Sequence, residues 1–177
     1  MLTAVIFFPG MVLHELAHAV ACFVFGSKVT AIKPWGPSGA SVTHAGTTGW
    51  KNFAISLAPF FVNTALAALC FFAAHKLVIL GPSAQAAAFY WLGASFAYYA
   101  FPSDTDLDSG WKVLWKHYKD SLLLRRGIFA FLFHLVTFPL LLPAWFALKI
   151  LGLLDAFTAG FAWAVFLLVL AAMPLVL

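Results

Sequence analysis

The chain has 177 residues, the length of one domain, and 64% of them are hydrophobic while only 9% are charged. Soluble domains are about half apolar and a quarter charged, so this composition excludes an ordinary soluble domain and indicates an integral membrane protein. The net charge of +4 comes from Lys and Arg residues beside the apolar stretches rather than in one basic stripe. We therefore expect the lipid bilayer as a partner and exclude nucleic acid.

Apolar segments of about 20 residues can cross a bilayer as helices, and five segments reach or approach this length. They are residues 1–26, 52–75, 85–103, 127–149 and 156–177. The sequence therefore predicts an all-α membrane protein with about five transmembrane helices, forming one domain over residues 1–177.

The connection between the first two segments, residues 27–50, has a different character. Short apolar runs flank a stretch rich in Pro and Gly at residues 34–39. Two short runs around a Gly/Pro turn are typical of a β-hairpin. We expect a small hairpin between the first and second helices.

Residues 106–126 have helical spacing, with aromatic and Leu residues on one side and Lys residues on the other. Trp and Lys favour the headgroup level, so this segment is predicted to be an interfacial amphipathic helix. Residues 127–177 supply two accessory transmembrane helices, the first of them kinked at Pro139 and Pro143. The last two helices either complete the bundle, control access of the substrate or form the interface of a homo-oligomer.

The Lys and Arg residues give an orientation in the membrane. Eight of them lie on one side of the predicted spans, and only Lys76 and Lys149 lie on the other. Because positive residues accumulate in cytoplasmic loops, the hairpin and the amphipathic segment are predicted to be cytoplasmic. The N-terminus is then outside and the C-terminus in the cytoplasm, as in a multi-pass protein.

Residues 14–18 read His-Glu-Leu-Ala-His inside the first apolar segment. Ionisable side chains within a membrane span are costly and mark a candidate functional site. Residues four apart share one helix face, so His14 and His18 can bind one metal ion while Glu15 lies alongside. This spacing predicts a hydrolytic zinc site in which Glu15 is the general base on a metal-activated water. A polar cluster without metal is the alternative.

A hydrolytic zinc site needs a third protein ligand. The third apolar segment ends near Pro102 and is followed by Asp104, Asp106 and Asp108. A Pro can break the helix there and leave a carboxylate facing a protein-lined cavity. Asp106 is the favoured ligand, Asp104 remains an alternative, and Asp108 is interpreted as a residue at a helix end.

The His-Glu-Leu-Ala-His motif, the hairpin after it and the Asp residues after the third segment resemble the site-2 protease family of intramembrane zinc metalloproteases. The resemblance is greatest to its small archaeal and bacterial members, and it covers about residues 1–110, the catalytic three-helix core. It implies that His14, His18 and an Asp from the third core helix bind zinc, with Glu15 as the base. The substrate would be a membrane-spanning or membrane-bound peptide, and the location a prokaryotic cell membrane.

Two further site residues follow from this resemblance. Asp106 matches the Phe-Pro-Ser-x-x-Asp ending of some small members, whereas the family's Leu-Asp-Gly and Asn-Pro-Asp-Gly patterns are not present. Asn63, after Pro59, resembles an Asn that lies near the substrate carbonyl in the family, and it is predicted to be catalytic. The alternative for Asn63 is a hydrogen bond to a neighbouring helix. The hairpin resembles strands that hold an extended substrate by edge pairing.

A different class of function is also compatible with the motif. His and carboxylate side chains within membrane spans mark ion pathways, so a transporter or channel with a metal-binding or proton-binding His-Glu-His site is the alternative. The sequence has no internal repeat, which disfavours a transporter plan. The predicted function is therefore an intramembrane zinc metalloendopeptidase.

Overall fold

The structure is a computed structural model that describes residues 2–33, 40–47, 49–122, 127–153 and 156–172. Its elements are, in chain order, α1 (Leu2–Ile6), α2 (Phe8–Phe25), β1 (Val29–Lys33), β2 (Ser41–His44), α3 (Trp50–Ile79), α4 (Ala84–Tyr98), α5 (Asp104–Leu122), α6 (Ile128–Leu153) and α7 (Ala156–Ala172). The predicted class, mostly helical with a small sheet between the first and second long helices, is confirmed.

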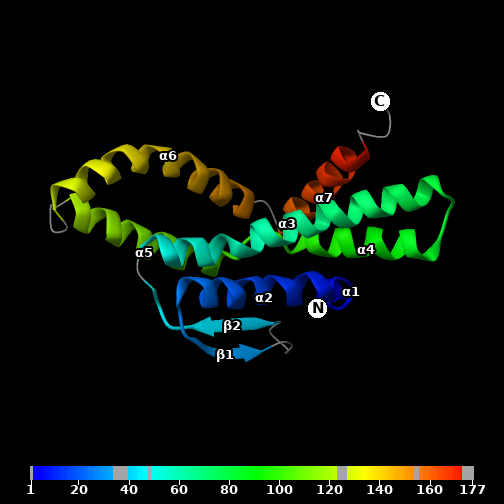
Figure 1. The fold of residues 1–177 in the computed structure, drawn as a ribbon, viewed down its shortest axis with the longest axis horizontal. Coiled ribbons are helices and arrows are strands. Elements are labelled where there is room, and N and C mark those ends of the chain that lie inside the picture. Colours follow the sequence, from blue (N-terminus) through cyan, green and yellow to red (C-terminus); the bar gives the residue numbers. More distant parts are fainter. Residues whose placement is uncertain (1, 34–39, 48, 123–126, 154–155, 173–177) are drawn as a thin grey trace.

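The core is formed by α2, α3 and α4, which lie side by side with alternating chain direction (Figure 1). Helix α3 is the centre of the fold, because it contacts α2, α4, α5 and α7. The two strands lie against the side of α2 that faces away from α3, with β2 between β1 and α2 (Figure 1). Helix α2 is therefore enclosed between a sheet and two long helices.

The predicted hairpin is confirmed as an antiparallel pair in which Ile32 pairs with Val42 and Lys33 with Ser41. A register irregularity lies between Val29 and Ala31. The predicted turn, at residues 34–39, lies outside the described residues. Strand β2 pairs with β1 along one edge, and it also contacts α2.

The predicted third helix, residues 85–103, differs from the structure. Helix α4 ends at Tyr98, and α5 begins at Asp104 after a short irregular segment. The break has a local cause: Pro102 has no N–H to donate to the carbonyl of Tyr98, and it disfavours helical geometry in the residue before it. As a result Asp106, expected at the end of the third core helix, belongs to the first turn of α5.

Among the described residues, α2 and α3 are long and apolar enough to cross a bilayer, judged by length and composition. Helix α4 has 15 residues, or about 22 Å at the rise of an α-helix, which is shorter than a hydrocarbon core of about 30 Å. The described apolar runs in α6 and α7 also have fewer than 18 residues. Five complete spans therefore stay a prediction.

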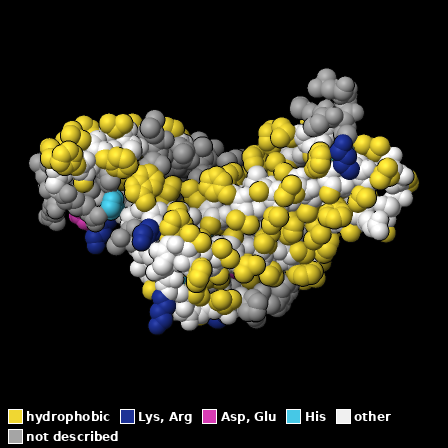
Figure 2. Space-filling view, in the orientation of Figure 1, with side chains coloured by type: hydrophobic (Ala, Val, Ile, Leu, Met, Phe, Trp, Pro, Cys, Tyr) yellow, Lys and Arg dark blue, Asp and Glu magenta, His cyan; other side chains and the backbone are white. Residues whose placement is uncertain are grey.

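Large hydrophobic side chains cover much of the outer surface, as Figure 2 shows for one face. On α2 itself Leu16, Val20 and Phe23 are exposed, Phe23 to 86%. In the same view several Lys side chains lie in the half of the molecule that contains the start of α3, with one more toward the far end of α3. An apolar surface of this extent marks a contact with lipid or with another apolar partner.

Part of the predicted apolar face of residues 106–126 packs within the protein, and the interfacial position of this segment stays a prediction. Leu114 and Tyr118 of α5 are buried against Phe53 of α3. The Tyr118 hydroxyl hydrogen-bonds to the hydroxyl of Thr137 in α6, with 3.0 Å between the oxygens. This face therefore attaches α5 to the core, and it positions the first turn of α5 beside α3.

Helix α2 approaches α4 closely at Gly10. Its N–H donates to the Ser95 hydroxyl at 2.8 Å, and that hydroxyl donates to the carbonyl of Phe7 at 2.9 Å. A Cβ on residue 10 would overlap the backbone carbonyl of Ser95. Only glycine fits this crossing, so α2 and α4 are held in one register.

Gly10→Ala is expected to destabilise the protein by about 1–3 kcal/mol, the usual cost of overpacking a close contact. Backbone atoms block the added methyl group, so relief requires the two helices to move apart. The measurement is thermal unfolding in detergent. Gly46→Ala is the matched control, because a Cβ at Gly46 meets nothing within 4 Å. Equal midpoints for the two variants would contradict the close crossing.

Candidate metal centre

Two histidines of α2 form the first part of the site. His14 and His18 lie one helical turn apart, with ring centroids separated by 5.0 Å. Both side chains are buried, with relative exposures of 7% and 5%. The predicted placement of both imidazoles on one helix face is therefore observed, and that face is turned into the protein.

Each imidazole donates a hydrogen bond to a backbone carbonyl of another element. His14 Nδ1 lies 2.8 Å from the oxygen of Tyr99, and His18 Nδ1 lies 2.9 Å from the oxygen of Ile55. A carbonyl oxygen only accepts, so Nδ1 carries the proton in both rings. Each Nε2 then has a free lone pair, which is the form that binds a metal ion.

Asp106 brings a carboxylate to these two nitrogens. Its Oδ2 lies 3.8 Å from His14 Nε2 and 3.5 Å from His18 Nε2. One ligand atom from each of the three residues lies within 4.8 Å of the others. Ligand atoms bound to one tetrahedral zinc at about 2.0–2.1 Å are about 3.3–3.4 Å apart, so the cluster is close to this geometry.

The chemistry of the three atoms also fits a metal ion. His18 Nε2 is buried and has no hydrogen-bond partner among the described residues. Two neutral imidazoles and one carboxylate are a common ligand set of hydrolytic zinc sites, which leave a fourth position for water. The residues present therefore fit zinc, with His14, His18 and Asp106 as its ligands.

A capping box at the start of α5 fixes the Asp106 side chain. Its Oδ2 accepts hydrogen bonds from the backbone N–H and the hydroxyl of Ser103, at 3.0 and 2.6 Å. The Ser103 oxygen also lies 3.2 Å from the Asp106 N–H, which completes the reciprocal pattern. The same carboxylate thus begins a helix and faces the histidines.

Asp106 is held in its ionised form. Burial of the carboxyl would raise its pKa, but the nearby rings of His14 and His18 and the hydrogen bonds from Ser103 outweigh burial and hold the pKa well below its usual range. Asp104 and Asp108 are exposed and do not belong to the cluster. The structure therefore brings Asp106, rather than Asp104, to the histidines.

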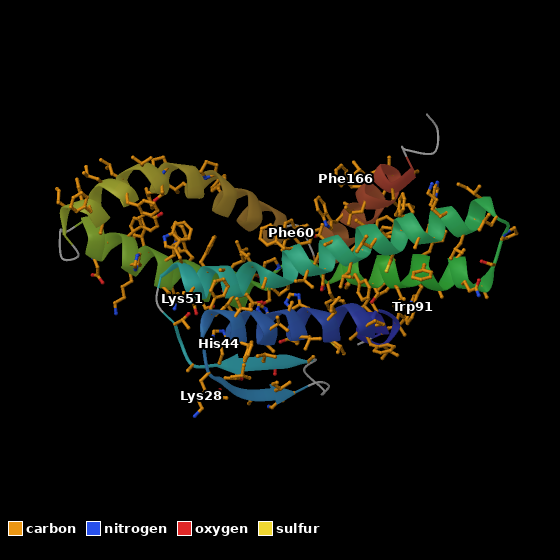
Figure 3. All side chains as sticks on the ribbon, in the orientation of Figure 1. Lys28, His44, Lys51, Phe60, Trp91 and Phe166 are labelled. Atoms are coloured by element: carbon orange, nitrogen blue, oxygen red, sulfur yellow. The ribbon has the colours of Figure 1, made fainter. Side chains whose placement is uncertain are left out.

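Glu15 lies beside the cluster without joining its ligand set. Its carboxylate interacts with the backbone of Val42 in β2, and both histidines lie close enough to influence it electrostatically. Figure 3 shows the hairpin next to the α2 helix, with His44 at the end nearer Lys51. The general-base candidate thus lies between the histidines and the strand.

Asn63 is linked to His14 through a shared backbone carbonyl. Its amide Nδ2 donates to the Gly10 oxygen at 3.2 Å and to the Tyr99 oxygen at 2.8 Å. The Tyr99 oxygen is also the acceptor for His14. Asn63 Oδ1 is buried and accepts no hydrogen bond from the described part of the chain. The amide group therefore supports the carbonyl that orients His14.

Sequence reasoning missed the residues that hold the ligands in place. Ile55 and Tyr99 contribute only backbone oxygens, so no side-chain motif identifies them. Ser103 could have been found, because Ser followed three residues later by an acidic side chain is a helix-start pattern.

The comparison with protein-family models decides the family. A model described as "Putative zincin peptidase" matches residues 7–105, more than half of the chain. The chain belongs to this family. Zincin peptidases are zinc metallopeptidases, so the predicted enzyme class and cofactor are confirmed at this level. No curated protein and no solved structure matches the chain.

The matched region of the zincin family includes His14, Glu15, His18 and Asn63, and it ends one residue before Asp106. A zinc metallopeptidase needs a metal centre, and His14 and His18 of the matched region belong to the group that could hold the ion. The narrower resemblance to site-2 proteases stays a prediction.

Proposed function

We propose that this zincin peptidase is an intramembrane endopeptidase that hydrolyses peptide bonds of membrane-spanning or membrane-bound substrates. The observation that carries the proposal is the position of the cluster. His14 and His18 lie inside α2, an apolar helix of 18 residues whose outward side chains include Leu16 and Val20. A catalytic centre within an apolar helix of this length supports a reaction at the depth of the hydrocarbon core.

Zinc, held by His14, His18 and Asp106, would supply the Lewis acidity that activates a water molecule and polarises the scissile carbonyl. The protein does the proton chemistry. Glu15 takes the proton of the attacking water and delivers it to the leaving amine. The hydrogen bonds from the two Nδ1 atoms orient both rings and select the neutral tautomer in which Nε2 carries the lone pair. Asn63 acts on this reaction through the Tyr99 carbonyl that orients His14.

The substrate is bound in extended form along β2. Strand β2 pairs with β1 on one side and faces α2 on the other, where the Val42 backbone meets Glu15. A peptide that adds to this side as a further strand passes directly beside the general base. Because a helix has no free backbone donors, a helical substrate must unwind before it pairs in this way.

The orientation in the membrane follows the distribution of basic residues. Lys28 and Lys51 lie at the same end of the fold (Figure 3), where α2 ends and α3 begins. This end is cytoplasmic in the proposal, with the N-terminus outside. In this orientation the hairpin begins at the cytoplasmic end of α2 in a prokaryotic membrane and runs back along α2 as far as Glu15.

Chelation tests the proposal. Purified protein in liposomes is incubated with a peptide that has one apolar span, and the products are identified by mass spectrometry. We expect cleavage within the span, at least about a hundredfold loss of rate with 1,10-phenanthroline, and recovery when zinc is restored, because the metal activates the water. Cleavage that persists without bound zinc, or that occurs only outside the span, would contradict the proposal.

A further inference from the structure

Pro59 lies in the interior of α3, which continues for 20 residues beyond it to Ile79. Its side chain is fully buried. In an α-helix the N–H of each residue donates to the carbonyl four positions earlier. Proline has no N–H, and its ring displaces that carbonyl from the helix axis. The carbonyl affected by Pro59 is that of Ile55.

The Ile55 carbonyl is the one that accepts the hydrogen bond from His18. The Nδ1-to-oxygen distance is 2.9 Å, both residues are buried, and the bond joins α2 to α3. Within a regular helix this oxygen would be directed along the axis to the N–H of residue 59. The proline thus provides an unengaged acceptor on the side of α3 that faces the histidine.

The other histidine has an equivalent arrangement. His14 donates to the carbonyl of Tyr99, where α4 has just ended. Three positions later stands Pro102, without an N–H, and the N–H of Ser103 donates to Asp106. The helical donors for Tyr99 are therefore missing or engaged elsewhere. Both histidines therefore donate to backbone carbonyls that lack their helical N–H donor, and in both cases a proline stands within four residues after the carbonyl.

We propose that Pro59 is a positioning residue of the metal centre. By removing the helical donor of the Ile55 carbonyl, it gives His18 a fixed acceptor for Nδ1–H, which keeps the proton off Nε2 and orients the ring. The inference rests on the zinc site of the proposed function. If the inference holds, zinc affinity depends on Pro59 although Pro59 contributes no ligand atom.

The proposal predicts opposite effects on stability and on metal affinity. A proline in a helix interior disfavours the helix, so its replacement by a residue with an N–H strengthens α3. The restored N–H then draws the Ile55 carbonyl back into the helix and weakens its bond to His18. A residue with a purely structural role would change both properties in the same direction.

Two variants separate the N–H from the side-chain volume. Pro59→Ala and Pro59→Val both restore the N–H, and Val is nearer to Pro in size. Pro139→Ala is the matched control, because Pro139 is also inside a helix, is exposed, and lies in α6. Each full-length protein is purified in detergent. Zinc affinity is measured by competition with a chromophoric chelator, and thermal unfolding is followed without metal.

We expect zinc to bind about tenfold more weakly to both Pro59 variants, in the range usual for groups that orient a ligand. Their unfolding midpoint without metal is expected to equal or exceed that of the wild type. Histidine ¹⁵N spectra should show loss of the Nδ1–H form at His18. Pro139→Ala should bind zinc like the wild type.

Zinc affinity within about twofold of the wild type in both Pro59 variants would overturn the proposal, and so would weaker binding together with a lower unfolding midpoint. These outcomes leave the proposed function intact, because the wild type still binds zinc. A wild type that binds no zinc would instead refute the proposed function, and this inference with it.

Discussion

Glu15→Gln is expected to bind zinc as the wild type does and to cleave its substrate about 10²–10⁴-fold more slowly, the usual contribution of a positioned general base. Gln has the same shape and can still accept a hydrogen bond from the backbone of Val42, but it cannot take a proton from water. The three ligands His14, His18 and Asp106 are unchanged. Rate constants in liposomes and zinc content of the purified protein are the measurements.

Asp120→Asn is the control for the loss of one negative charge. Asp120 lies in α5, about 21 Å of helix rise from Asp106. We expect its rate and zinc content to match the wild type. A wild-type rate in Glu15→Gln would exclude Glu15 as the base. A loss of zinc in the same variant would show instead that the carboxylate belongs to the ligand set.

The histidine pair could be predicted because its geometry depends on one helix alone. Once residues 8–25 form a helix, the four-residue spacing fixes His14 and His18 on one face whatever surrounds them. The sequence also indicated that this face is functional, since buried polar side chains in an apolar helix need partners. Helix periodicity and desolvation were sufficient for this part of the site.

The backbone acceptors of the two histidines could not be predicted, because they depend on how helices pack. The carbonyls of Ile55 and Tyr99 become acceptors only where α3 and α4 lie against α2. Asn63 was predicted as a catalytic group with a helix-to-helix hydrogen bond as the alternative, and its amide is found in such bonds. A contact of the side chain with substrate stays a prediction.

The extent of the third helix was wrong because hydropathy does not detect a helix end. Residues 99–103 carry no charge and include Ala100 and Phe101, so the pattern favoured one span to residue 103. The local signals were Pro102 and the spacing of Ser103 to Asp106, which end one helix and begin another. This break turns the carboxylate of Asp106 toward α2, so the metal centre depends on it.

Asp106→Ala is expected to weaken zinc binding by more than about 100-fold, since loss of a ligand exceeds the 10–100-fold effect of groups that only orient one. It also removes half of the capping box, which costs about 1 kcal/mol of stability. Competition with a chromophoric chelator measures the first effect, and thermal unfolding without metal measures the second.

Two matched variants separate the ligand from the cap and decide between the two aspartates. Ser103→Ala removes the hydroxyl that contacts Asp106 but keeps the carboxylate, so we expect a similar loss of stability with at most about a tenfold loss of zinc affinity. Asp104→Ala removes an exposed carboxylate of the same helix turn, outside the cluster. Its effect should be limited to about 0.3–1 kcal/mol of helix stability, with unchanged zinc affinity. Zinc loss in Asp104→Ala together with normal binding in Asp106→Ala would reverse the assignment, because the exposed carboxylate would then have to turn inward to reach the histidines.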